Sequence, residues 1–237
     1  MLILLPPSEG KAEPAKRGRP VDLTSLPFPQ LTGTRRTILD AVLARAEPPS
    51  NARLADRPAA AAGSVYTGVL YAALGYSTLG PGAKRRAHGS ILVQSALWGP
   101  IGLADRIVPY KLAMDAPLTA VGPLAARWRA VLGPVLTERA GSGVVVDCRS
   151  ATYAAAWRPT GDVARRTVTV RVFTEINGRR TTVSHWAKHT RGEVARWLLE
   201  APRAPETVAA VAKIVGEHVR CELVDLGRAG RALDIVL

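Results

Sequence analysis

The stretch "SGVVVDCRS", Ser142–Ser150, decides the fold class of this chain. It is a short apolar run that ends abruptly in polar residues, which is typical of a buried strand that carries polar side chains at its tip. The stretch "TYAAAW" follows at 152–157 and reads as a short helix. In open α/β sheets, ligands bind where strands give way to helices. The sequence therefore predicts Asp147, Ser150 and Tyr153 at a ligand-binding edge.

Further elements are predicted on both sides of this stretch. Strands are expected at 2–6, within 91–99, at 167–176 and from 179 on, at 220–226 and at 231–237. Helices are expected after a Thr34 cap with a stop at 47–50, across 63–75, at 124–138 with a kink or break at Pro134, after a Thr190 cap, and from Pro205 to about 217. Asn177-Gly178 is the preferred two-residue hairpin turn and sets Ile176 opposite Arg179. These elements alternate without strict βαβ order. We therefore expect one compact α/β (mixed α+β) domain over 1–237, with a mixed sheet and flanking helices.

The net charge indicates which class of partner the protein binds. The 237 residues carry a net charge of +13, which favours phosphate-bearing partners. Arginine outnumbers lysine 26 to 6, so a GC-rich coding bias is an alternative source of the charge.

No run has the length of a membrane span, and the start lacks the basic region of a signal peptide. We expect a cytoplasmic protein whose cysteines, Cys148 and Cys221, are free thiols. The Pro-rich segment at 11–30 is expected to be a loop or a mobile basic arm.

The stretch "LWGPIGLADRIVPYKLAMD", Leu97–Asp115, combines two prolines with two cations. Its G-P-I-G portion resembles a helix-hairpin-helix turn, in which Gly99 and Gly102 would present backbone N–H groups to a DNA phosphate. A helix is expected to resume at Leu103. Arg106, Tyr110 and Lys111 would then line one wall of a basic cleft. The alternative is a tight connection that packs Trp98 into the core.

A second basic segment follows the predicted hairpin. Lys188, His189 and Arg191 stand at an expected helix start, where unpaired N–H groups and added cations favour phosphate. A solvated basic turn is the alternative. Asp147 beside His185 or His189 would make a base with its orienting partner, although pairing with an arginine is the commoner fate of such an aspartate.

Five stretches, in one order, resemble the YaaA family of bacterial peroxide-stress proteins. They are "LILLPPSEGK" at 2–11, "SVYTGVLY" at 64–71, "LVQSALWGPIGLADRIVPYKLAMD" at 92–115, "VVDCRSATYAAAW" at 145–157 and "VSHWAKHTRGEVARWLL" at 183–199. The resemblance implies a cytoplasmic protein of mixed α/β fold with a helix-hairpin-helix-like element and a positively charged DNA-binding cleft, which protects cells from peroxide by limiting unincorporated iron. It maps family motif positions onto Lys11, Tyr66, Thr67, Arg106, Tyr110, Lys111, Ser150, Tyr153, Lys188 and Arg191. Asp147 and the C-terminal "LGRAGRALDIVL" depart from the family pattern.

Three hypotheses for function follow. The first is a stress protein that binds double-stranded DNA without sequence choice, or another phosphate-bearing ligand, through the cleft. The second is an enzyme acting on a nucleic acid or nucleotide, such as a lysine-dependent lyase or a glycosidase, with Lys111, Lys11 and Asp147 as candidate catalytic residues. An iron-binding protein is the weakest, because the four histidines have no paired spacing. No cofactor and no metal site are predicted.

Overall fold

Strand β1, Leu2–Leu5, lies at the centre of the sheet. The computed structural model describes residues 1–13, 16–45, 51, 53–182 and 184–237. All four residues of β1 are buried, as expected for a strand covered on both faces. Its neighbours β3 (Ile91–Ser95) and β6 (Val145–Asp147) both run parallel to it. The predicted buried strands at 2–6, 91–99 and 142–150 are therefore confirmed.

One mixed sheet of eight strands extends outward from β1. Its order is β4-β3-β1-β6-β7-β10-β9, and β8 pairs with β7. The other strands are β4 (Gly99–Ile101), β7 (Thr167–Ile176), β8 (Arg179–Thr182), β9 (Cys221–Asp225) and β10 (Arg231–Val236). Strands β3, β1, β6, β7 and β10 are mutually parallel, whereas β4, β8 and β9 are antiparallel to their neighbours. The parallel strands follow the doubly wound order 2-1-3-4-5, so the chain changes direction across the sheet at β1.

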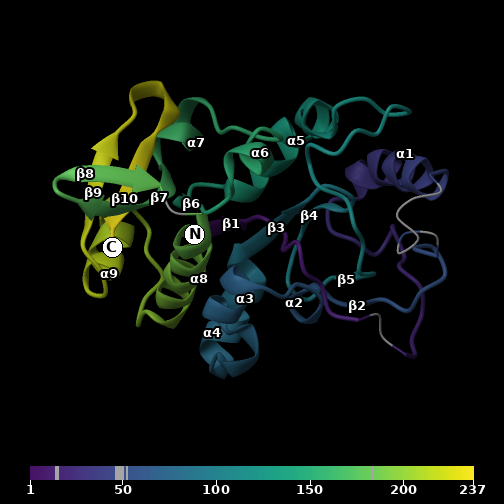
Figure 1. The fold of residues 1–237 in the computed structure, drawn as a ribbon, viewed down its shortest axis with the longest axis horizontal. Helices are drawn as coiled ribbons and strands as arrows, with labels where there is room; N and C mark the ends of the chain where they lie inside the picture. The colour runs from purple at the N-terminus through teal and green to yellow at the C-terminus, as the bar shows by residue number, and fades with distance from the viewer. Residues whose placement is uncertain (14–15, 46–50, 52, 183) are drawn as a thin grey trace.

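Helices cover both faces of this sheet. They are α1 (Thr32–Leu43), α2 (Ala62–Val65), α3 (Val69–Leu74), α4 (Pro81–Ser90), α5 (Leu124–Ala140), α6 (Ala151–Ala154), α7 (Gly161–Arg165), α8 (Ser184–Glu200) and α9 (Val208–Gly216), with short 3-10 turns at Pro29–Leu31, Tyr76–Thr78 and Gly227–Ala229. Figure 1 shows α3, α4, α8 and α9 on one side of the sheet and α5, α6 and α7 on the other. A two-stranded sheet, β2 (Ala60–Ala61) with β5 (Arg106–Ile107), lies to one side. The result is the single compact mixed α/β domain that the sequence predicts.

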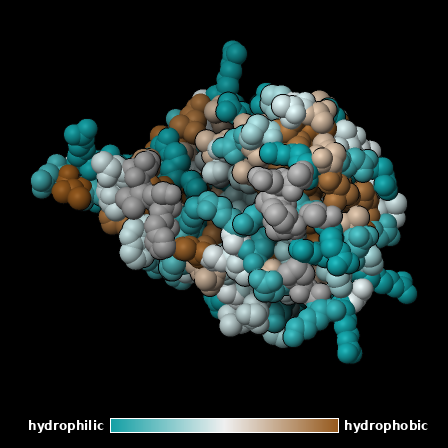
Figure 2. All heavy atoms as spheres, turned by 45° about the vertical axis from the view of Figure 1, so that its right-hand side comes forward, coloured by the Kyte–Doolittle hydropathy of each residue, from teal (hydrophilic) through white to brown (hydrophobic). Residues whose placement is uncertain are grey.

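The β7–β8 hairpin has the predicted register, with Ile176 opposite Arg179 across Asn177-Gly178. Asn177 and Gly178 both have positive φ, as this turn type requires. The hairpin projects from the body of the molecule (Figure 1). Elsewhere the surface in Figure 2 is mostly hydrophilic, with small apolar groups between polar side chains.

Several helix boundaries differ from the prediction. Helix α1 begins at Thr32 instead of after a Thr34 cap, and the stop predicted at 47–50 lies outside the described residues. The run at 63–75 is two helices, because Tyr66 is extended and pairs with Lys11, and Gly68 has a φ of 95° before α3 begins. Pro134 lies inside a continuous α5. Helix α8 starts at Ser184, so Thr190 is an interior residue, and Thr207 caps α9 by accepting a hydrogen bond from the Ala210 N–H.

The helix-hairpin-helix prediction at 99–102 is wrong. Gly99–Ile101 is strand β4, which pairs antiparallel with β3, and the predicted helix from Leu103 is a turn followed by β5. Trp98 is fully buried, so the alternative of a tight connection that packs this ring into the core is correct. Pairing with the preceding strand, which local sequence does not encode, decides the conformation of this segment.

The predicted arm at 11–30 is hydrogen-bonded to the body of the protein near its start and near its middle. The Ala12 N–H donates to the Val65 carbonyl, and the Ala59 N–H donates to the Arg19 carbonyl. Further along, Leu23 and Leu26 are buried in the core. Residues 14–15 lie outside the described residues, and ordering of the arm on ligand binding stays a prediction.

Candidate functional site

A cavity of about 910 Å³ opens at the carboxyl ends of β1 and β6. Its walls come from the loop after β1, the start of α3, the segment 111–117, the residues after β6 and the first turns of α8. Because β1 is where the chain changes direction across the sheet, this is the crevice in which doubly wound proteins bind ligands. Its volume lies within the range of about 300–1,000 Å³ that is usual for small-ligand sites.

Most of the residues predicted from sequence gather here. Those that line the cavity are Lys11, Thr67, Lys111, Ser150, Tyr153, Lys188 and Arg191. They come from five separate segments of the chain, and only the fold brings them together. Tyr66 and Tyr110 are buried beneath Lys11, since the Lys11 Nζ lies 5.8 Å and 4.4 Å from the centroids of their rings.

Lys11 is held in place from several sides. Its backbone forms an antiparallel bridge with Tyr66, and its Nζ donates to the Ser8 carbonyl oxygen at 2.8 Å. Burial lowers the pKa of Lys11 from 10.5 to about 8; the carboxylate of Glu9 opposes this shift and the positive charge of Lys111 adds to it. An appreciable fraction of this amine is therefore neutral near pH 7.5.

Hydroxyl groups form a chain under Lys11. The Ser95 Oγ lies 2.7 Å from the Tyr110 hydroxyl, which lies 3.2 Å from the Tyr66 hydroxyl. The Ser95 Oγ also accepts from the N–H groups of Leu97 and Trp98. Burial raises the pKa of both tyrosines, so each keeps its proton at neutral pH. Leu97–Tyr110 therefore supports the floor of the site rather than its wall.

Two more tyrosines border the cavity. The Tyr71 hydroxyl donates to the Pro6 carbonyl oxygen at 2.7 Å and so ties α3 to the end of β1. Tyr153, on α6, is half-buried, and burial raises its pKa to about 12. Each tyrosine can therefore donate a hydrogen bond but carries no charge, which leaves recognition of an anion to the basic side chains.

The basic side chains stand around the opening. Lys111 is exposed, and its backbone N–H and carbonyl are both bonded to the buried side chain of Asn51 at 2.9 Å and 2.7 Å. Across the cavity, the Lys188 Nζ lies 3.3 Å from the Glu9 carboxylate, and the Arg191 Nε donates to the Val170 carbonyl. Among the described lining residues, five are basic and two acidic: Lys11, Arg45, Lys111, Lys188 and Arg191 against Glu9 and Asp115.

Three predicted phosphate contacts lie elsewhere. Gly99 packs against Trp128, and a Cβ at this position would come within 2.6 Å of that ring. The Gly102 N–H already donates to the Asp105 carboxylate at 2.6 Å. Arg106, on β5, donates to the Ala59 carbonyl and does not line the cavity. None of the three belongs to the basic cavity.

Asp147 is also outside the cavity. It forms a buried, bidentate ion pair with Arg149. The Arg149 Nε donates to the Asp147 Oδ1 at 2.9 Å, and the Nη2 donates to the Oδ2 at 2.7 Å. His189 faces Glu193 at 3.1 Å instead. The alternative of an internal arginine partner is thus correct, and the pairing of Asp147 with His189 as a catalytic base is wrong. The side chain of His185 lies outside the described part of the chain.

Sequence reasoning missed several cavity residues. Glu9 and Asp115 supply its two carboxylates, and Arg45 donates to the Pro117 carbonyl at 2.6 Å. Asn51 fixes the backbone of Lys111 from 60 residues away. No local pattern marks these four, because their roles depend on contacts between distant segments. Glu9 and Asp115 lie within stretches that the sequence singled out, whereas Arg45 and Asn51 do not.

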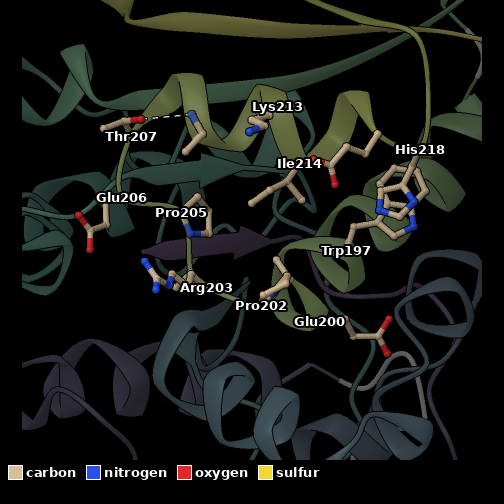
Figure 3. A pocket seen from close by; sticks show the side chains of 14 residues that line it. Trp197, Glu200, Pro202, Arg203, Pro205, Glu206, Thr207, Lys213, Ile214 and His218 are labelled. Atoms are coloured by element: carbon tan, nitrogen blue, oxygen red, sulfur yellow. Dashed lines mark hydrogen bonds between the residues drawn. The ribbon is translucent and has the colours of Figure 1, made fainter.

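A second cavity, of about 820 Å³, lies between the end of α8 and α9 (Figure 3). Trp197 and His218 stack in it with ring centroids 4.5 Å apart, and Thr207 caps α9 beside it. Its lining includes Lys213 and Arg203 but also three glutamates, Glu200, Glu206 and Glu217, so the basic residues are not in excess. It contains no residue that the sequence predicted for function, and the cavity beside β1 remains the candidate site.

Across the described ranges, no three His, Cys, Asp or Glu side chains are grouped so as to hold a metal ion. No helix in the same ranges is long and apolar enough to cross a membrane. Cys148 and Cys221 are free thiols, as predicted; Cys148 is buried and Cys221 half-buried.

The fold and the cavity define a class: doubly wound α/β proteins with a cavity lined by basic residues at the carboxyl edge of the central strands. Within it, the chain belongs to the family described as "Peroxide stress protein YaaA", which matches residues 1–216. A UPF0246 protein of Streptomyces coelicolor is 41% identical over 259 residues, covering 100% of this chain and 98% of that protein. A UPF0246 protein of Corynebacterium efficiens is 37% identical over 234 residues, with 90% and 91% covered. One from Cereibacter sphaeroides is 32% identical over 184 residues, with 76% and 70% covered.

Proposed function

We propose that this chain acts in the cytoplasmic response to peroxide stress by binding DNA, or another phosphate-bearing ligand, in the cation-lined cavity. The observation that carries the proposal is the placement of Lys11, Lys111, Lys188 and Arg191 around one opening at the carboxyl ends of β1 and β6. Family membership supplies the peroxide-stress part. Protection against iron-dependent damage would then act through the nucleic acid rather than through bound iron.

The charge balance favours an anion. The basic residues that line the cavity outnumber the two acidic ones. A phosphate that enters between Lys111 and Lys188 therefore neutralises excess positive charge. The ion pair between Lys188 and Glu9 does not prevent this, because Glu9 is exposed and surface pairs are worth only about 0–1 kcal/mol. A phosphate group can therefore replace Glu9 as the partner of Lys188 at little cost.

The size of the cavity sets how DNA would bind. A volume of about 910 Å³ admits one nucleotide but not a duplex. A duplex would therefore lie across the opening, with its backbone near Lys111 and Lys188, while a single nucleotide leaves the stack to enter. Extrusion costs least where a base is missing, damaged or already unpaired. Single-stranded and abasic DNA should accordingly bind more tightly than an intact duplex.

Binding across a salt series tests the proposal. Short duplex, single-stranded and abasic oligonucleotides would be titrated against the wild type, Lys111→Ala and Lys213→Ala. Each phosphate contact contributes a log–log slope of about −0.9 in duplex and about −0.7 in single strands. Lys111→Ala should flatten the slope by about one contact. Lys213→Ala is the matched control, since Lys213 lines the other cavity, and it should behave as wild type.

Two results would count against the proposal. If no DNA binds at low salt, the DNA form of the proposal fails, the charge of +13 reflects composition, and only a smaller phosphate-bearing ligand is left for the cavity. If Lys213→Ala flattens the slope and Lys111→Ala does not, the binding site is the cavity between α8 and α9.

A further inference from the structure

Lys11 differs from the other cavity cations in its surroundings. Lys111 and Lys188 are exposed, as phosphate-binding lysines usually are, whereas Lys11 is half-buried against the rings of Tyr66 and Tyr110. Lys11 is nevertheless one of the residues that line the cavity. A lysine that only neutralises phosphate gains nothing from such desolvation. A lysine nucleophile does, because an amine attacks only when it is neutral.

The neighbours of Lys11 suit covalent chemistry with a carbonyl group. The Lys11 Nζ is fixed by its bond to the Ser8 carbonyl, and the protonated hydroxyls of Tyr66 and Tyr110 lie beneath it. The residues lining the rest of the cavity include Lys111, Lys188 and Arg191, which can hold a phosphate on the same molecule. A ligand with both an aldehyde and a phosphate ester could react with Lys11 and bind these cations at the same time.

We propose that Lys11 forms a Schiff base with the aldehyde of a phosphate-bearing sugar, such as the ring-opened deoxyribose of an abasic nucleotide. This inference rests on the proposed function, since it requires a phosphate-bearing ligand in the same cavity. The amine lone pair attacks the aldehyde carbon, and the carbonyl electron pair moves to the oxygen, which takes up a proton as the nitrogen loses one. The hydroxyl of the resulting carbinolamine takes up a further proton from solvent and leaves as water, as the nitrogen lone pair forms a protonated carbon–nitrogen double bond. The step needs no oxidant or reductant.

Reductive trapping tests the Schiff base. Wild-type protein would be incubated with a single-stranded oligonucleotide containing one abasic site, with the same oligonucleotide intact, or with 2-deoxyribose 5-phosphate. Borohydride then adds hydride to the imine carbon and makes the link permanent. We expect an adduct that adds the mass of the sugar compound less one oxygen atom. The intact oligonucleotide, which has no aldehyde, should give none.

The position of the adduct decides the role of Lys11. Peptide mapping of the trapped wild-type protein should place it on Lys11, and Lys11→Ala should abolish it. Lys213→Ala should leave the yield unchanged. Trapping of the oligonucleotide alone would identify DNA as the source of the sugar, whereas trapping of both compounds would identify sugar phosphates as a class. Mapping uses the wild type only, so the test stands even where Lys11→Ala does not fold.

The absence of an adduct with both compounds would overturn the inference, and so would an adduct mapped mainly to another lysine. These failures are distinguishable from failure of the proposed function. If the salt slope depends on Lys111 but nothing is trapped, the cavity binds phosphate and Lys11 is not a nucleophile. If neither binding nor trapping occurs, both proposals fail.

Discussion

Asp147 and Arg149 form a buried ion pair at the end of β6, in which both carboxylate oxygens accept from the guanidinium at 2.9 Å and 2.7 Å. Arg149 also donates to the Trp157 carbonyl at 2.8 Å, and its side chain has no exposed surface. The pair therefore fastens the strand end to the segment after α6. It positions the edge from which Ser150 and Tyr153 reach the cavity, without entering the cavity itself.

Removal of Asp147 should destabilise the protein rather than abolish ligand binding. Asp147→Ala leaves the buried guanidinium of Arg149 without its counter-ion, which typically costs about 3–5 kcal/mol. Urea unfolding would measure the loss, and the folded fraction should retain the salt slope of the wild type. A variant with unchanged stability that no longer reacts with substrate would instead place Asp147 in the reaction.

Gly99 is predicted to matter for packing. A side chain there meets the ring of Trp128 at 2.6 Å, and the backbone has a φ of +67°. Gly99→Ala should lower the free energy of unfolding by about 2–4 kcal/mol, through overpacking and backbone strain. Phosphate affinity should not change once the folded fraction is taken into account. A flatter salt slope with unchanged stability would restore the role in DNA binding that the sequence indicated.

Asn51 should control the position of Lys111. Asn51→Ala removes both hydrogen bonds to the Lys111 backbone and leaves its N–H and carbonyl to find water. We expect a loss of about 1–3 kcal/mol in stability. The affinity for single-stranded DNA should fall several-fold although every cation is still present. Lys84→Ala is a suitable control for affinity, because Lys84 bonds the Ser77 carbonyl away from the cavity. Equal effects of the two changes would contradict this role.

Trapping by Lys11 should depend on pH in a defined direction. Because burial lowers the pKa of this amine from 10.5 to about 8, it is mostly protonated and unreactive well below that pH. The initial trapping rate should rise about tenfold per pH unit below pH 8 and level off above it. Rates would be measured from about pH 6 to about pH 9.5 with excess borohydride as quench. A rate that still climbs tenfold per unit above pH 9 would indicate an ordinary exposed lysine.

Sequence periodicity predicts the elements whose conformation is local or whose burial is complete. The apolar runs of β1, β3 and β6 are short and uninterrupted. This is the pattern of parallel strands in a sheet that is covered on both faces. The β7–β8 hairpin follows from Asn177-Gly178, which adopts positive φ at low cost. Boundaries set by tertiary contacts were missed. Helix α8 begins at Ser184 instead of after Thr190, and Gly99–Ile101 becomes a strand by pairing with β3.

In the candidate site, too, some features follow from the sequence and others depend on contacts between distant segments. Lys11, Lys111 and Lys188 were predicted from three separate stretches of the chain, and the fold brings them to one opening. The sequence could not distinguish Lys11 from the other two, because its partial burial depends on Tyr66 and Tyr110, which lie 55 and 99 residues away along the chain. Nor could it exclude Arg106, since only the position of β5 shows that this side chain points elsewhere.

Hydrogen–deuterium exchange, with and without a single-stranded abasic oligonucleotide, tests the central claim most directly. If the cation-lined cavity is the binding site, peptides that cover 6–11, 111–117 and 187–191 should exchange more slowly in the complex. Peptides that cover 200–218, around the second cavity, should not change. Protection confined to 200–218, or to the β7–β8 hairpin, would contradict the account and place the ligand away from the ends of β1 and β6.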